Sequence, residues 1–461
     1  MPNRNLVTLP VAALLPTLLA ACSMAPAYQV PVTPEAPAVY SETGPWTPAA
    51  PADDAARGTW WQVFNDATLN DLEGRIEGHN LQLAAALARY DQAVALTGQA
   101  QAGLLPSLNL TAWQSRTRDP RNGDLNNYLA GATASYEIDL WGRIRNTVAA
   151  NRANAEASAA DVATLRLSLQ AKLAETYMSL RGADAQIALL HQSVEAYQKA
   201  LDLTTDRFKG GAAGEIDVGR ARTQLGTTQS QLEQLGASRA LLEHAIAVLL
   251  GEQPSSFHLD AVSDAITVPQ IPVDAPSGLL QRRPDIAAAE RRVYAANAGI
   301  GVARAARFPS LTLAAGGGNE EYVGQTGPYW AIGPVAASLP VFDGGARKAG
   351  VASARAQFEQ AADTYRLTVL TAFQDVEDQL ALNNRLAVAA DRQDEAVTAA
   401  TRTNQLALIQ YKEGAASYLD VVTAQTSELD ARRTALTLRT TRLLAGIDLI
   451  RALGGGWQAS K

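Results

Sequence analysis

Two aspartates stand at equivalent places in this chain, each shortly after a glycine-containing break between helical patterns. Asp217 lies in the segment 208–218 and Asp420 in the segment 411–421. An acidic side chain in the first turn of a helix accepts hydrogen bonds from N–H groups that have no partner within the helix. Carboxylates gathered in a ring around a pore would instead concentrate cations. The two roles stand equal for Asp217, and we favour the second role for Asp420.

Both breaks contain residues that favour a tight reversal of the chain. Glycine accepts the left-handed backbone conformation with which many helices end. Leu419 directly precedes Asp420, and leucines gathered in a ring would close a pore with an apolar constriction. The other residues of the two turns that we single out are Gly210, Gly211, Gly214, Gly414 and Ser417.

The residue patterns that would support an enzyme are missing from the sequence. It contains no nucleophile elbow, P-loop or dinucleotide-binding fingerprint. Three methionines are too few for a methionine-lined copper path. We therefore expect no catalytic site, no metal and no cofactor apart from a covalent lipid. The histidines, whose spacing matches no metal or catalytic cluster, are His79, His191, His244 and His258.

Cys22, the only cysteine, is a candidate site of lipid attachment. An apolar run over 6–19 forms a secretory signal that is too short for a membrane span. The small residues directly before Cys22 match the bacterial lipobox, in which the thiol is acylated after cleavage. We predict a signal peptide over 1–21 and a lipid such as palmitate on Cys22, with an ordinary signal peptide as the alternative. Ser23, where an aspartate would favour retention in the inner membrane, indicates the outer membrane.

A proline-rich segment follows the predicted lipid-attachment site. Seven prolines lie between Pro26 and Pro51, and such a composition favours an extended, semi-rigid chain over a packed core. We predict that residues 22–59 form a linker that leads from the lipid along the outside of the folded body.

Charge and hydropathy narrow the remaining possibilities. The net charge is −7 and the basic residues are spread along the chain, so we expect no nucleic-acid-binding surface. After the signal, no apolar run reaches the roughly 18 residues that a membrane-spanning helix requires. If the protein crosses a membrane, it must therefore do so as strands.

The chain contains a long internal duplication. Residues 105–251, moved forward by 203 positions, match the second half without a gap. The offset pairs Gly142 with Gly345, and Asp217-Val218 with Asp420-Val421. This period is far longer than the roughly 20–50 residues of solenoid repeats, so we expect two structurally equivalent halves.

Long helices with a seven-residue pattern must carry the two turns. Apolar residues alternate in steps of four and three over 169–201, a spacing that keeps one seam toward a partner helix. Further ladders run over 218–249, where Arg239 takes one of the ladder positions, and over 422–450. The segment 142–208 contains no proline, so it can form one helix of about 100 Å. A dimeric coiled-coil rod would also explain these ladders.

Short segments with poor helix character separate the helices and argue against a rod. They follow Pro106 and Pro309. Each is about ten residues long, which suffices for a tilted strand to cross a bilayer. Polar or glycine-rich loops over 116–128 and 319–328 would join the strands into two hairpins. The predicted strands are 107–115, 129–140, 310–318 and 329–341.

Four strands in each chain set a requirement on assembly. Four strands cannot close a barrel, and open sheet edges leave backbone groups unsatisfied in lipid. Barrels formed by one chain have about eight strands or more. Copies of the chain must therefore pool their strands, and three copies would supply twelve. The same symmetry would gather the helices into a second cylinder below the membrane.

Several motifs spread over the mature chain are more specific than its composition. They are Trp60-Trp61-Gln62-Val63-Phe64, Asn80-Leu81-Gln82-Leu83, Tyr136-Glu137-Ile138-Asp139-Leu140-Trp141-Gly142-Arg143, Arg282-Arg283-Pro284-Asp285-Ile286 and the run 300–309. With these motifs the chain resembles the outer-membrane factors of tripartite efflux systems, the TolC-like family, and in particular the lipoprotein branch of multidrug exit ducts.

The resemblance implies an α+β membrane protein. It would be a homotrimer with a 12-stranded β-barrel, four strands from each chain, continued by a long periplasmic α-helical barrel. As a passive duct, anchored in the outer membrane by its lipid and its barrel, it would receive substrate from an inner-membrane pump of the RND type through a periplasmic adaptor protein. We place the two repeats at 60–251 and 277–454, an equatorial connector at 252–276 and a C-terminal tail at 455–461.

The resemblance also implies a periplasmic gate at the two turns. In the family, a leucine and one or two aspartates one helical turn apart close the aperture. Leu419 and Asp420 match two of these positions, and Thr423 stands where many members have the second aspartate. Asp217 and Tyr411 match one pair of side chains that links the hairpins in the closed state.

One link of the family is not matched, because Ala416 replaces its arginine. The resemblance further implies that the turns contact the adaptor protein, through the residues Gly210, Gly211, Gly214, Gly414 and Ser417.

Two functions fit this architecture. The first is an exit duct for drugs or other small solutes, and the alternative is the outer-membrane duct of a type I protein secretion system. The lipobox at Cys22 and the motif at 282–286 favour efflux.

Overall fold

A computed structural model describes residues 23–33, 39–42, 58–120, 123–262, 267–269, 271, 283–322 and 325–455. The predicted signal peptide, the lipid-attachment residue Cys22 and residues 456–461 lie outside the described residues. The chain divides into two units, each built from three separate stretches. The sheet unit comprises Met1–Thr33, Leu87–Asp161 and Asp285–Thr368, and the turn unit comprises Pro34–Ala86, Val162–Pro284 and Val369–Lys461.

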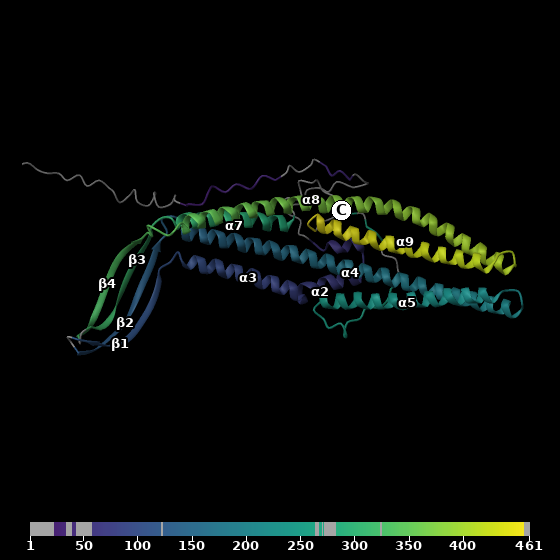
Figure 1. Ribbon diagram of the computed structural model, residues 1–461, viewed down its shortest axis with the longest axis horizontal. Coiled ribbons are helices and arrows are strands. Elements are labelled where there is room, and N and C mark those ends of the chain that lie inside the picture. Colours follow the sequence, from purple (N-terminus) through teal and green to yellow (C-terminus); the bar gives the residue numbers. More distant parts are fainter. Residues whose placement is uncertain are drawn as a thin grey trace, which may run out of the picture. The chain divides into compact units, whose positions relative to one another are not determined.

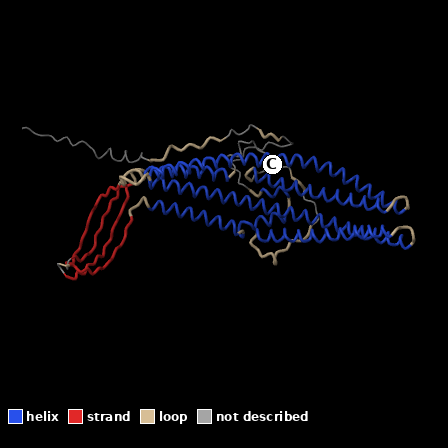
Figure 2. The backbone as a smooth tube through the Cα atoms, viewed as in Figure 1, coloured by secondary structure: helices blue, strands red, loops and turns tan. Residues whose placement is uncertain are grey.

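The sheet unit holds a sheet of four antiparallel strands in the order β1-β2-β3-β4, red in Figure 2. β1 (Ser107–Asp119) pairs with β2 (Gly123–Ile138), and β3 (Ser310–Tyr322) pairs with β4 (Gln325–Ser338). The two predicted hairpins are therefore confirmed, and β2 and β3 join them into one sheet. β1 and β4 are its two edges.

The strands are longer than the sequence predicted. We expected loops over 116–128 and 319–328, but most of both ranges is strand. Polar residues in a strand resemble a loop in the sequence, yet they can pair across the ladder. The Arg116 guanidinium donates to the Asp124 carboxylate at 2.9 Å, and such cross-strand pairs of opposite charge stabilise a sheet.

The strand register gives the sheet two unlike faces, because successive residues of a strand point to opposite sides. The apolar face carries the exposed side chains of Leu108, Leu110, Trp330, Ile332 and Val335. The polar face carries Asn109, Thr111, Thr133, Ser135 and Thr312. Large apolar residues on this face are exceptions: Trp113, Leu125 and Leu129. Apart from such exceptions, apolar and polar residues thus face opposite sides of the sheet in each of the four strands.

The longer helices repeat in pairs at the offset found in the sequence. The pairs are α3 (Leu81–Ala102) with α7 (Pro284–Ala305), α4 (Arg143–Lys209) with α8 (Ala346–Lys412), and α5 (Glu215–Leu249) with α9 (Tyr418–Ala452). α4 and α8 each have 67 residues, which corresponds to about 100 Å and confirms the predicted helix. Among the described residues, two short helices precede α3: η2 (Trp60–Phe64) and α2 (Ala67–His79). Among the described helices, none combines the length and apolarity that crossing a membrane requires.

In the turn unit, α5 lies beside the C-terminal part of α4, and α9 beside that of α8 (Figure 1). The predicted ladder on α4 is buried, with Leu173, Leu180 and Leu190 at 0% exposure. Leu225 of α5 and Leu429 of α9 belong to the same apolar cluster as Leu190. The seam that a coiled-coil rod would use is therefore filled by helices of the same chain.

A buried ionic cluster in the turn unit holds the connector against the helices. Asp184 of α4 accepts hydrogen bonds from Arg181 at 3.0 Å and from Arg239 of α5 at 2.6 Å. The same arginines donate to the backbone carbonyls of Asp260 at 2.7 Å and Leu259 at 2.6 Å. Arg239, which takes one position of the second predicted ladder, therefore holds the connector through the Leu259 carbonyl and does not pack as an apolar residue would.

Candidate functional site

The two predicted turns have the same backbone geometry. Gly211 and Gly414 take left-handed φ values of +75° and +80°. In each turn the next residue donates its N–H to the carbonyl five residues earlier, at 2.8 Å, the bond with which a glycine commonly ends a helix. Gly210 is not in the left-handed region, and Glu413 stands at its equivalent position. Gly211 and Gly414 are therefore the glycines that the reversal requires.

The helices after the turns begin with different caps. The Ser417 hydroxyl accepts from the N–H of Asp420, whose carboxylate accepts from the Ser417 N–H at 3.0 Å and from its hydroxyl at 2.8 Å. This reciprocal capping box satisfies two backbone N–H groups. Gly214 caps α5 without a side-chain hydrogen bond. The capping role, which we ranked below the gating role for Asp420, is therefore present in the structure.

Leu419, Asp420 and Thr423 lie together on an exposed face of α9. The opposite face buries Tyr418 and Val421 in the core. The Leu419 side chain is 48% exposed, although it is large and apolar. The Thr423 hydroxyl donates to the carbonyl of Leu419 at 2.8 Å. The sequence-predicted gate residues of the second turn are thus adjacent, and the leucine and the carboxylate are accessible in the chain.

Asp217 and Tyr411 make no hydrogen bond to each other within the described chain. The Asp217 carboxylate pairs with Arg220 at 3.3 Å, and the Tyr411 hydroxyl is buried with no hydrogen-bond partner among the described residues. Asp217 acts on Tyr418 instead: burial raises the pKa of the Tyr418 phenol to about 12, and the negative charge of Asp217 adds to the rise. Asp217 also lies in the first turn of α5, where its negative charge interacts favourably with the positive end of the helix dipole.

Arg207, which the sequence analysis did not identify, joins the two helical pairs. It donates to the carbonyls of Tyr411 at 3.1 Å and Lys412 at 3.2 Å, and its guanidinium lies 4.7 Å from the centre of the Tyr411 ring. These carbonyls lie at the C-terminal end of α8. The guanidinium therefore satisfies them with hydrogen bonds, and its positive charge interacts favourably with the negative end of the helix dipole. Gln410 stands at the position equivalent to Arg207, so the duplication gives no sign of this contact.

Arg207→Ala is expected to destabilise the turn unit by about 2 kcal/mol, the typical value for hydrogen bonds to a charged group. Arg207→Lys should lose an intermediate amount, because an ammonium keeps the charge but not the planar fork. Thermal or urea unfolding of the purified protein measures both, with the exposed Arg222→Ala as the control. Equal stability of the alanine variant and the unmodified protein would contradict the assignment.

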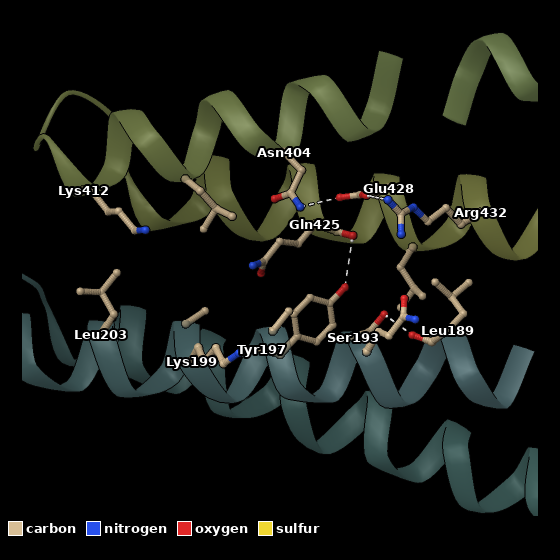
Figure 3. Close-up of a pocket in the computed structure, with 15 residues that line it drawn as sticks. Leu189, Ser193, Tyr197, Lys199, Leu203, Asn404, Lys412, Gln425, Glu428 and Arg432 are labelled. Atoms are coloured by element: carbon tan, nitrogen blue, oxygen red, sulfur yellow. Dashed lines mark hydrogen bonds and ion pairs between the residues drawn. The ribbon is translucent and has the colours of Figure 1, made fainter. Parts of the chain in front are cut away.

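A cavity of about 570 Å³ lies between the helical pairs near the turns (Figure 3). Tyr197 points across it from α4 and donates to the carbonyl of Gln425 at 3.2 Å. On the other wall, Glu428 accepts from Asn404 at 2.5 Å and from Arg432 at 2.6 Å. The Tyr197–Gln425 hydrogen bond and the apolar cluster that contains Leu190 and Leu429 therefore join the two helical pairs beside this cavity.

Known proteins resemble the chain over nearly its whole length. The family described as "Outer membrane efflux protein" matches residues 74–252 and 275–455. The pyoverdine export outer membrane protein OpmQ of Pseudomonas aeruginosa is 33% identical, covering 87% of this chain and 88% of that protein. The toluene efflux pump outer membrane protein TtgC of Pseudomonas putida is 31% identical, covering 99% and 96%.

A solved structure shares the fold. The outer-membrane channel OprN superposes with a TM-score of 0.86 at 30% identity, covering 95% of this chain and all of that one. Two family matches, one in each half, agree with the paired helices and hairpins described above. The chain therefore belongs to the outer membrane efflux protein family.

Proposed function

We propose that this protein is the outer-membrane exit channel of a tripartite efflux system. It conducts drugs or other small solutes passively, after an inner-membrane pump of the RND type and a periplasmic adaptor protein have delivered them. Membership of the efflux family supports this function, as do relatives that serve pyoverdine export and toluene efflux. The adaptor protein would contact the turns that contain Gly211, Gly414 and Ser417.

The two-faced sheet is the observation that carries the proposal. Its apolar face suits lipid and its polar face suits an aqueous lumen. β1 and β4 have no strand partner on their outer sides within the described chain, and such edges must be paired in a bilayer. Three copies that join β4 of one chain to β1 of the next would close a barrel of twelve strands, so we infer a homotrimer.

The segment that follows Cys22 supports a lipid on this residue. The Ser23 hydroxyl donates to the Asn146 side chain at 3.0 Å, and Arg304 donates to the carbonyl of Met24 at 3.3 Å. Asn146 lies in the first turn of α4, which begins soon after β2 ends. Ser23, the residue that directly follows Cys22 in the sequence, therefore lies at the helix end of the sheet. We infer that an acyl chain on the preceding cysteine enters the leaflet of the membrane there.

Efflux from living cells tests the proposed function. Deleting the gene that encodes this chain should raise the accumulation of amphiphilic fluorescent dyes in energised cells. Complementation with the same gene should reverse the change. A proton uncoupler should abolish the difference. Unchanged dye accumulation together with loss of a secreted protein would contradict efflux and favour the type I secretion duct.

Cys22→Ser is expected to abolish the incorporation of radiolabelled palmitate. Most of the protein should remain in the outer membrane, because the barrel anchors it independently of the lipid. Metabolic labelling and membrane fractionation measure the two effects, and Ser23→Ala, which keeps the thiol, is the matched control. Palmitate on the Cys22→Ser variant would contradict the acceptor assignment, and loss of all membrane association would contradict the self-inserting barrel.

A further inference from the structure

One row of the polar face places a tyrosine beside two glycines. Thr111, Gly131, Gly318 and Tyr329 are register partners across β1, β2, β3 and β4. Gly318 and Tyr329 lie close to the tip of the second hairpin, because β3 ends at Tyr322 and β4 begins at Gln325. Thr111 and Gly131 lie farther from the tip of the first hairpin. The tips are the end of the sheet that is remote from the connections to α4 and α8.

The tyrosine side chain lies along the sheet and does not stand away from it. A Cβ atom at Gly131 would lie 2.7 Å from the hydroxyl oxygen of Tyr329. Tyr329 belongs to β4 and Gly131 to β2, with Gly318 of β3 between them in the register. The side chain of Tyr329 therefore crosses one strand and ends where a side chain of residue 131 would begin.

Neither glycine position has room for a side chain, although only the Cβ at Gly131 would contact the tyrosine. A Cβ at Gly131 would also lie 2.8 Å from the carbonyl oxygen of Gly317, and a Cβ at Gly318 would collide with the backbone of Ala130 and Gly131. Gly327, two residues before Tyr329 and on the same face, has no atom within 4 Å of its Cβ position. Space is therefore restricted under the tyrosine and open next to it.

We propose that Gly131 lets Tyr329 lie flat against the wall of the channel, and that this sets the width of the lumen near its outer mouth. The inference rests on the proposed function, because it takes the polar face as the lining of the lumen. Three-fold symmetry would place three such tyrosines at one level. A side chain at residue 131 would push each phenol ring off the wall and into the solute path.

A cysteine deeper in the channel reports the width of the mouth without any dependence on the periplasmic gate. Ala336 is exposed, lies on the polar face as the partner of Thr312, and is near the helix end of β4. Intact cells that carry Ala336→Cys are treated with maleimide-polyethylene glycols of graded mass. A reagent labels the cysteine only if it passes the level of Tyr329. The chain with Ala336 unchanged measures the background.

Gly131→Val is expected to lower the largest reagent mass that labels the reporter, by at least one step of the series. Adding Tyr329→Ala should restore it, because the displaced ring is then gone. Gly327→Val is the matched control and should leave the mass limit unchanged. If valine prevents assembly, Gly131→Ala makes the same contact with one methyl group. An unchanged limit, or a lowered limit that Tyr329→Ala does not restore, would overturn the proposal.

Tyr329→Ala alone gives a second test that leaves both glycines in place. A ring that already lies flat obstructs little, so the mass limit should rise by no more than one step. A large rise would mean that the tyrosine normally projects into the lumen, and it would overturn the proposal. The smallest maleimide should label Ala336→Cys in protein recovered from the outer membrane. If it does not, the proposed channel is contradicted, and the inference that rests on it is contradicted as well.

Discussion

Replacing Leu419 and Asp420 together by alanine is expected to raise the single-channel conductance of the purified protein several-fold. Both side chains are exposed on one face of α9, beside a turn that three copies would bring to a common axis. A ring of leucines is an apolar constriction, and smaller side chains widen it. Asp430→Ala, which removes another exposed carboxylate from the same helix, is the control and should leave the conductance unchanged.

The capping role of Asp420 can be separated from its charge. Asp420→Asn removes the carboxylate charge but keeps an oxygen that can accept the bonds from Ser417, so cation selectivity should fall with little loss of stability. Ser417→Ala should do the reverse, with a loss of about 1 kcal/mol of stability and unchanged selectivity. Reversal potentials and melting temperatures of the same samples measure both. Unchanged conductance in the double variant, together with unchanged selectivity in Asp420→Asn, would contradict the assignment of the gate to this turn.

Glu73→Gln is expected to abolish a fall in thermal stability between about pH 5 and pH 9. Glu73 lies in α2 of the turn unit at 0% exposure, and neither carboxylate oxygen has a hydrogen-bond partner among the described residues. Burial raises its pKa from 4.5 to about 9. The folded chain therefore keeps a proton that the unfolded chain releases, and stability falls as the pH rises through this range, by at most about 1.4 kcal/mol per pH unit.

Melting temperatures of the purified protein across this pH range measure the effect. Below about pH 4.5 both the folded and the unfolded chain hold the Glu73 proton, so Glu73 should contribute no pH dependence to the free energy of unfolding. At neutral pH, burial of Glu73 should lower the free energy of unfolding by an amount on the order of 3 kcal/mol. Glu77→Gln, on the exposed side of the same helix, is the control and should keep the pH dependence. A Glu73→Gln variant with the same pH dependence as the unmodified protein would show that Glu73 is not held protonated.

The sequence predicted the elements that depend on periodicity and on local backbone preference. The seven-residue ladders identified α4, α5 and α9 because each ladder packs against helices of the same chain. The duplication extends further than the matched residues 105–251, since α3 and α7 also repeat at the same offset. Gly211 and Gly414 were legible because a left-handed turn strongly favours glycine. The strand ends were not, because paired polar residues near a hairpin tip have the composition of a loop.

The contacts of the site were less accessible to sequence analysis. The spacing of Ser417 and Asp420 is that of a capping box, so this contact could have been found. Arg207 could not, because its acceptors are backbone carbonyls on a helix about 200 residues away, and carbonyls leave no mark in a sequence. The Tyr329 arrangement likewise depends on the register of three strands. Contacts of this kind follow from the tertiary structure and not from local propensity.

The ionic current through a planar bilayer that contains the purified protein tests the central claim most directly. The protein alone, without pump or adaptor, should give discrete conductance steps that favour cations, and chemical cross-linking should show that the inserted species contains three chains. Membrane-inserted protein that gives no conductance steps, either unmodified or with Leu419 and Asp420 replaced by alanine, would contradict an exit channel.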